Sequence, residues 1–260
     1  VNSVYKNLED KTNKEILEGD MPINYFINKS CENKGVSKNN LYTNQNNNKF
    51  IFENIYENQI WNNRNTNIPI SGPGSSLENT KDYSNLLNKF IYENECKSVL
   101  DLGCGDLTWI PKTQFFNDND IKYIGVDIVE SLITSHRKNF PEKLFLCKDI
   151  TSYIDFDIDN FDTDNFDTDN FDIIIIRDVI FHLKNDKILS IFDNIKNNFK
   201  FLIITNCRKC VNTDNFNKWH FSEKNIHIEP FNKSHNFIIK MEEPVFNRDV
   251  LIYSHNSFYK

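Results

Sequence analysis

The chain has 260 residues, a formal net charge of −7 and an isoelectric point of about 5.4. This acidic balance disfavours a protein that holds nucleic acid phosphates through its overall charge. The longest apolar run, 173–176, is far too short to cross a bilayer, and no signal peptide is visible. We therefore expect a cytoplasmic protein with reduced cysteines and no membrane partner.

Residues 1–49 are polar and rich in Asn and Lys, which predicts a poorly ordered extension or linker. Because the sequence starts with Val, this extension could instead tether an upstream domain of a longer protein. We expect one folded domain over 50–260, beginning near the segment FIFENIYENQIW.

The stretch SGPGSSLENT (71–80) is a glycine-rich turn that leads into a helix. Ser75 and Glu78 form a capping box, which predicts a helix running to about Phe90. Free N–H groups at a helix start favour an anionic group of a ligand, whereas the alternative is a capped helix behind a hinge. The candidate substrate-binding residues are Ser71, Gly72, Gly74, Ser75 and Ser76.

The stretch VLDLGCGDLTW (99–109) is the most informative part of the sequence. An apolar run is typical of a buried parallel strand, and two glycines follow it two positions apart. Glycine is favoured where the backbone needs a positive φ or must approach a ligand closely. A strand, a glycine turn and a helix opening near 107 predict a nucleotide-sized slot. Neither a P-loop nor the GxGxxG dinucleotide fingerprint is present.

Strands and helices alternate beyond this turn, which predicts a doubly wound parallel sheet. The predicted strands lie near 98–102, 122–127, 143–148, 172–177 and 200–205. The predicted helices lie near 107–116, 129–138 and 185–197. After residue 206 the alternation stops, and the last two predicted strands form an antiparallel pair at one edge, near 237–240 and 250–253.

Asp101, Asp127 and Asp149 end the first three predicted strands in succession. One such Asp alone would be a helix cap or turn residue, but three in this order favour a nucleotide site. Together with the D-x-G-x-G pattern at 101–105, they resemble the class I S-adenosylmethionine (SAM) methyltransferases over about residues 75–205.

The segments YENQIW, SGPGSSL and RDVIFHL (177–183) further resemble a bacterial and viral subgroup of that family. Asn62 stands where the subgroup usually has Gly, and its D-x-x-x-G-x-W-R stretch survives only partly around Trp219. The resemblance implies a Rossmann-like α/β fold, with a seven-stranded sheet of order 3-2-1-4-5-7-6 that carries one antiparallel edge strand. It also implies SAM as the cofactor.

The resemblance assigns the SAM site to the strand ends. Asp101 fixes the glycine loop or reaches the methionine ammonium, and Asp127 accepts the ribose hydroxyl protons. Asp149 takes the adenine amino group, with Ile150 against the ring. The implied cofactor-binding residues are Asp101, Gly103, Cys104, Gly105, Asp127, Ile128, Asp149, Ile150 and Arg177.

Arg177, Asp178 and His182 are the candidate catalytic residues, because they follow the fourth strand, where the family places its acceptor. Asp178 and His182 are four residues apart and share a face if a helix starts at once. Asp178 can then orient the imidazole, which takes a proton from an acceptor hydroxyl or ammonium, while Arg177 holds an anionic group. The alternative is that His182 packs under the sheet and Asp178 caps the helix.

The expected activity is methyl transfer to a hydroxyl or amine of a small molecule, with a sugar or nucleotide-sugar in glycan modification favoured. A nucleic acid (cap-type) or protein methyltransferase is the alternative, and a nucleic acid enzyme should show a basic groove. A non-catalytic SAM-fold module should show a degraded glycine turn, whereas the turn here is intact.

Two further patterns contain residue types that bind metal ions, but neither predicts a metal site. The repeat DFDIDNFDTDNFDTDNFD (155–172) lacks the glycine and closing Glu of an EF-hand, which indicates an expanded surface loop. Cys207 and Cys210 form a lone CxxC pair, which is weak evidence for zinc. The histidines that follow complete no familiar ligand pattern: His220, His227 and His235.

Overall fold

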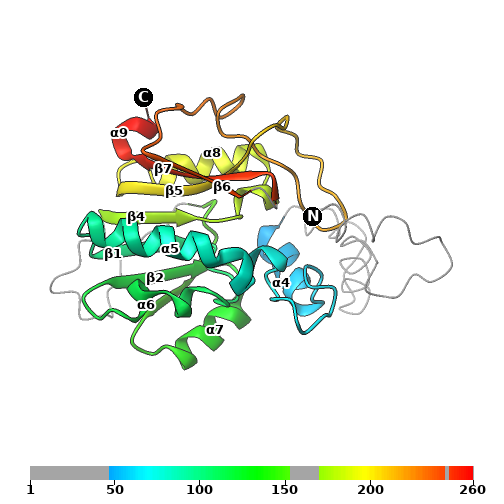
Figure 1. The fold of residues 1–260 in the computed structure, drawn as a ribbon. Helices are drawn as coiled ribbons and strands as arrows, with labels where there is room; N and C mark the ends of the chain where they lie inside the picture. The colour runs from blue at the N-terminus through cyan, green and yellow to red at the C-terminus, as the bar shows by residue number, and fades with distance from the viewer. Residues whose placement is uncertain (1–46, 153–169, 244–245, 260) are drawn as a thin grey trace.

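The computed structural model describes residues 47–152, 170–243 and 246–259 (Figure 1). Almost all of the predicted N-terminal extension, and the FDTDN repeat up to residue 169, lie outside these ranges. Among the described helices, none has the length and apolar character needed to cross a membrane.

Seven strands form one mixed sheet in the order β3-β2-β1-β4-β5-β7-β6. β1 to β5 run parallel, and β7 runs antiparallel to both of its neighbours. The predicted fold class and strand order are confirmed, with β7 as the reversed strand beside the edge strand β6. The strands are β1 (Ser98–Leu102), β2 (Lys122–Asp127), β3 (Leu144–Cys147), β4 (Phe171–Ile176), β5 (Phe199–Cys207), β6 (Ile239–Glu243) and β7 (Arg248–Ser254).

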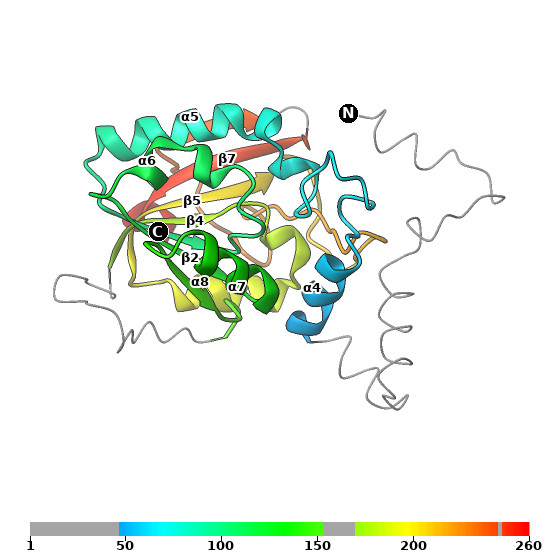
Figure 2. The ribbon, with the colours of Figure 1, turned by 90° about the horizontal axis from the view of Figure 1, so that it is seen from below.

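Helices cover both faces of the sheet, which explains why β4 is an unbroken apolar run (Figures 1 and 2). Ile173 and Ile175 pack in one buried cluster with α5, whereas Ile174 and Ile176 pack in the other with α8. The first face carries α5 (Leu77–Glu93), α6 (Gln114–Asn117) and α7 (Glu130–Asn139), and the second carries α8 (Asn185–Asn194) and α9 (His255–Phe258). The helix α4 (Asn48–Glu57) lies beyond the carboxyl ends of the strands.

The start of α5 differs from the prediction by one residue. Ser76, not Ser75, is the N-cap, because its side chain accepts a hydrogen bond from the N–H of Asn79. The helix continues to Glu93, three residues beyond its predicted end.

The predicted helix at 107–116 is wrong at its start. Leu107 has a φ of 54°, so the glycine turn extends past residue 105 and no helix can begin there. The Asp106 side chain accepts hydrogen bonds from both the N–H and the hydroxyl of Thr108, which stabilises the turn. Only a short 3₁₀ turn, η3 (Ile110–Lys112), precedes α6.

Candidate active site

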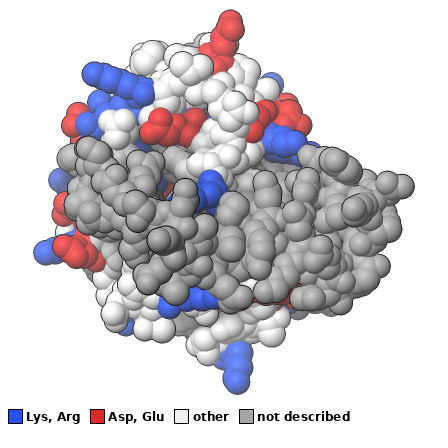
Figure 3. Space-filling view, turned by 90° about the vertical axis from the view of Figure 1, so that its right-hand side faces the viewer, with Lys and Arg blue, Asp and Glu red and all other residues white. Residues whose placement is uncertain are grey.

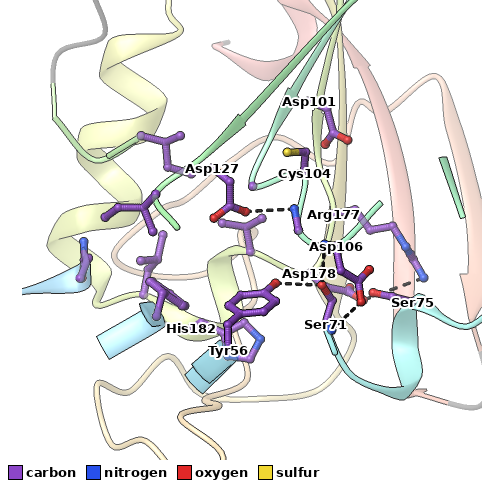
Figure 4. A pocket seen from close by; sticks show the side chains of 18 of the residues that line it. Tyr56, Ser71, Ser75, Asp101, Cys104, Asp106, Asp127, Arg177, Asp178 and His182 are labelled. Atoms are coloured by element: carbon purple, nitrogen blue, oxygen red, sulfur yellow. Dashed lines mark hydrogen bonds and ion pairs between the residues drawn. The ribbon is translucent and has the colours of Figure 1, made fainter. Parts of the chain in front are cut away.

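A pocket opens at the carboxyl ends of β1 to β4, around the point where the strand order reverses between β1 and β4 (Figure 4). Open α/β sheets bind ligands at this position. The structure brings all the residues expected to bind the cofactor to this one pocket: Asp101, Gly103, Cys104, Gly105, Asp127, Ile128, Asp149, Ile150 and Arg177.

The glycine turn is possible only with glycine at its two positions. Gly103 has a φ of +82° and Gly105 a φ of +61°, which side chains rarely tolerate. A Cβ at Gly103 would collide with the side chain of Val179, and one at Gly105 would lie 2.7 Å from the Ser71 hydroxyl. Glycine at both positions therefore lets the turn pack closely against Val179 and Ser71.

Two buried carboxyl groups border this turn. One oxygen of Asp127 accepts the N–H of Gly105 at 3.0 Å, and the other accepts the N–H of Val129 at 3.0 Å. Burial raises the pKa of Asp127, although these N–H groups oppose the rise. Asp101 accepts the Tyr123 hydroxyl at 2.7 Å, and burial raises its pKa to about 7. Both groups are fixed in position and keep acceptor capacity for a ligand.

The predicted substrate-binding turn is tied to the glycine turn by hydrogen bonds. The Ser71 hydroxyl accepts the N–H of Asp106 at 2.9 Å and shares a hydrogen bond of 2.8 Å with the Tyr56 hydroxyl. Burial raises the pKa of Tyr56 well above its usual value, so its phenol stays protonated. Only two of the predicted substrate-binding residues line the pocket, Ser71 and Ser75.

One wall of the pocket was missed by the sequence interpretation. Asn48, Phe52 and Tyr56 line it from successive turns of α4, and Trp61 follows them. Their spacing of four residues places them on one helix face, and this periodicity is the signal that could have identified them.

His182 lies in this aromatic wall. Its ring centroid is 4.5 Å from that of Trp61, and its Nδ1 lies 2.6 Å from the carbonyl oxygen of His220. A carbonyl can only accept, so Nδ1 carries the proton of the neutral ring and Nε2 is the basic nitrogen. Burial lowers the pKa of His182 to about 4.

Asp178 and His182 are not joined by the helix expected from their spacing. Asp178 has a φ of 60°, and only a 3₁₀ turn, η4 (Ile180–His182), follows it, so the two residues do not share a helix face. The Asp178 carboxylate instead lies 2.7 Å from a guanidinium nitrogen of Arg248. Burial disfavours its ionisation, but Arg248 and Arg177 outweigh that effect and lower its pKa.

Arg177 is held by partners within the chain. It forms an ion pair of 3.0 Å with Glu243, donates to the carbonyl oxygen of Gly74 at 3.2 Å, and lies over the ring of Tyr83. The guanidinium therefore joins the end of β4 to β6 and to the turn before α5.

Comparisons with known proteins agree with this architecture. Residues 77–236, more than half of the chain, match a family model described as "Methyltransferase domain". The N-methyltransferase NodS from Bradyrhizobium japonicum WM9, solved with S-adenosyl-L-homocysteine, is 11% identical with a TM-score of 0.53, covering 77% of this chain and 97% of NodS. At this identity the likeness shows the fold.

Magnesium protoporphyrin IX methyltransferase from Synechocystis PCC 6803, solved with SAM, is 13% identical with a TM-score of 0.46, covering 66% of this chain and 77% of that one. No curated protein gives a significant match. The match over residues 77–236 shows that the chain belongs to the methyltransferase domain family, as a SAM-dependent methyltransferase.

Proposed function

We propose that SAM binds in the pocket at the ends of β1 to β4, and that its methyl group passes to a hydroxyl or amine of a small molecule. The observation that carries the proposal is the convergence of the glycine turn, Asp127 and His182 on one pocket. The residues fit the cofactor. The acidic groups Asp101, Asp127 and Asp149 line the pocket and suit a ligand with ammonium and sulfonium charges.

Each anchored acid has a distinct task in this proposal. Asp127 accepts the ribose hydroxyl protons, while Asp101 faces the methionine part beside the glycine turn. Asp149 lies at the adenine end with Ile150, and its own Oδ1 is fixed by the N–H of Thr151 at 2.9 Å. The carboxylates are held before any ligand arrives, so binding requires little reorganisation.

When bound, SAM supplies an electrophilic methyl group. The protein must position the acceptor and remove its proton, and His182 Nε2 is the group we assign to the proton. A hydroxyl oxygen becomes more acidic as it is methylated, and the neutral imidazole can accept the released proton. Burial lowers the pKa of His182 to about 4, which keeps the imidazole unprotonated at neutral pH.

Asp178 and Arg177 are positioning residues in this account. Asp178 is paired with Arg248 and Arg177 is paired with Glu243, so neither is free to accept a proton or to hold an anionic substrate group without breaking a buried ion pair. These ion pairs fix the turn between β4 and η4, and His182 is the last residue of η4.

A small-molecule acceptor with a ring, such as a sugar or nucleotide-sugar, suits the pocket best. Phe52, Tyr56 and Trp61 line the pocket, and the first two pack edge to face against Trp61. On the side of the molecule where α4 lies, both acidic and basic side chains of the described residues are visible (Figure 3). The net charge of −7 disfavours a nucleic acid substrate held through its phosphates.

The acceptor class is tested by incubating the full chain with methyl-labelled SAM and a panel of acceptors. The panel contains nucleotide-activated sugars, free glycans, capped RNA oligonucleotides and a protein extract. We expect label in a saccharide fraction. Label in RNA or protein would contradict the proposed acceptor class, while leaving the SAM site in place.

A further inference from the structure

Three metal-binding side chains converge at the carboxyl end of β5. The sulfur atoms of Cys207 and Cys210 and a carboxylate oxygen of Glu223 all lie within 4.8 Å of one another. Both cysteines are free thiols, and neither lies in the pocket described above. The chain itself brings Glu223 near, because the N–H of Cys207 donates to the carbonyl oxygen of Lys224 at 2.9 Å.

We propose that these three residues form a zinc site. Zinc bonds of about 2.0–2.3 Å in a tetrahedron place ligand atoms roughly 3–4 Å apart, so small side-chain rotations close the observed spacing. Two thiolates favour zinc over magnesium or calcium, which prefer oxygen ligands. Glu223 is exposed, so a water molecule can complete the tetrahedron from the solvent side.

The charges around the site are compatible with a bound cation and two thiolates. Two thiolates and a carboxylate exceed the charge of a zinc ion by one negative unit. The next residue, Lys224, has a fully buried side chain, and its ammonium donates to Asn185 at 2.8 Å and pairs with Asp214 at 3.2 Å. The ammonium of Lys224 also interacts electrostatically with the Cys210 thiol and favours its thiolate form.

In the proposed site, zinc would link the segment 208–224 to the end of β5. This segment supplies the carbonyl of His220, which fixes His182, and the carbonyl of Trp219, which accepts the Trp61 indole N–H at 2.8 Å. Zinc would therefore stabilise the wall of the pocket from behind without entering it. The inference depends on the donor geometry alone and holds whichever acceptor is methylated.

The test uses the full chain purified under reducing conditions. Mass spectrometry of the metal content should give about one zinc per chain, and cobalt substitution should give a thiolate-to-cobalt charge-transfer band. Cys207→Ser and Cys210→Ser should lose both signals. Cys96→Ser, which removes another buried free cysteine, is the matched control and should keep them.

Glu223→Gln provides a variant that leaves both cysteines intact. It should lower zinc affinity by at least about tenfold, measured by competition with a chromophoric chelator, because an amide carries no negative charge. A metal-free protein that takes up neither zinc nor cobalt would overturn the proposal, as would zinc that remains bound in folded Cys207→Ser. SAM binding, measured on the same samples, reports separately on the proposed function.

Discussion

The Nδ1 atom of His182 lies 2.6 Å from the carbonyl oxygen of His220, although 38 residues separate the two in the sequence. This contact fixes the tautomer of the imidazole and leaves Nε2 as the nitrogen that can accept a proton. The segment after β5 therefore orients the proposed base directly, whereas Asp178 is paired with Arg248 and acts on it only through the turn before η4.

Removing the imidazole tests its role as a base. In His182→Ala we expect the rate of methyl transfer to fall by about 10²–10⁴-fold, the usual effect of losing a general base, while SAM binding is retained. Single-turnover kinetics and calorimetry measure the two quantities separately. A folded variant that binds SAM and turns over at the parental rate would remove His182 from the mechanism.

The same residue makes stability depend on pH. Burial lowers the pKa of His182 from 6.5 to about 4, so between these values the unfolded chain binds a proton that the folded chain does not. Above pH 6.5 the imidazole is neutral in both states and does not lower the stability. As the pH falls from 6.5 towards 4, the free energy of unfolding decreases by at most about 1.4 kcal/mol per pH unit. The free energy of unfolding, measured by urea titration at several pH values, should depend less steeply on pH in His182→Phe. An unchanged slope would contradict the assigned buried, neutral imidazole.

The variant Asp178→Asn tests whether Asp178 stabilises the fold through Arg248 or acts as the base. The change leaves Arg248 with a weaker partner, and because Asp178 is partly exposed we expect a loss of about 1–3 kcal/mol in the free energy of unfolding. Urea denaturation measures it, and Asp120→Asn, at an exposed site, is the control. Full stability combined with a rate loss of about 10²–10⁴-fold would instead make Asp178 the base.

Gly103→Ala tests the need for bare backbone at the turn. A side chain at a φ of +82° is strained, and its Cβ collides with Val179, so we expect a loss of about 1–3 kcal/mol in stability. Adding Val179→Ala should recover part of the loss by removing the collision, while the φ strain remains. Denaturation curves that coincide with the parental one would refute this assignment.

Local patterns were enough to predict most of the fold. The isoleucines of β4 fill both faces of the sheet, and this strand lies within one residue of the predicted range 172–177. The helix expected at 107 failed because Leu107 adopts a left-handed conformation that Asp106 stabilises through its side chain. A helix pattern in the sequence does not report such a side-chain turn.

The site was predictable where its residues end successive strands. Asp101 and Asp127 lie at the pocket because parallel strands deliver their carboxyl ends to one edge. His220 and Glu223 could not be found in this way, because they reach their partners from a long irregular segment after β5. Their positions depend on tertiary contacts that no local spacing encodes.

Asp127→Ala removes the acid assigned to the ribose. We expect SAM binding to weaken by about 1–3 kcal/mol, the range for buried hydrogen-bond groups left without a partner. Calorimetry measures the change, and Asp120→Ala is a matched control at an exposed site. Equal affinity in the two variants would place the ribose elsewhere.

The most direct test of the account is calorimetry of the full chain with S-adenosylhomocysteine and, separately, with NAD. Both ligands carry an adenosine moiety, but only the first matches a pocket assigned to SAM. We predict that S-adenosylhomocysteine binds and that NAD does not. Binding of NAD without binding of S-adenosylhomocysteine would contradict the central claim.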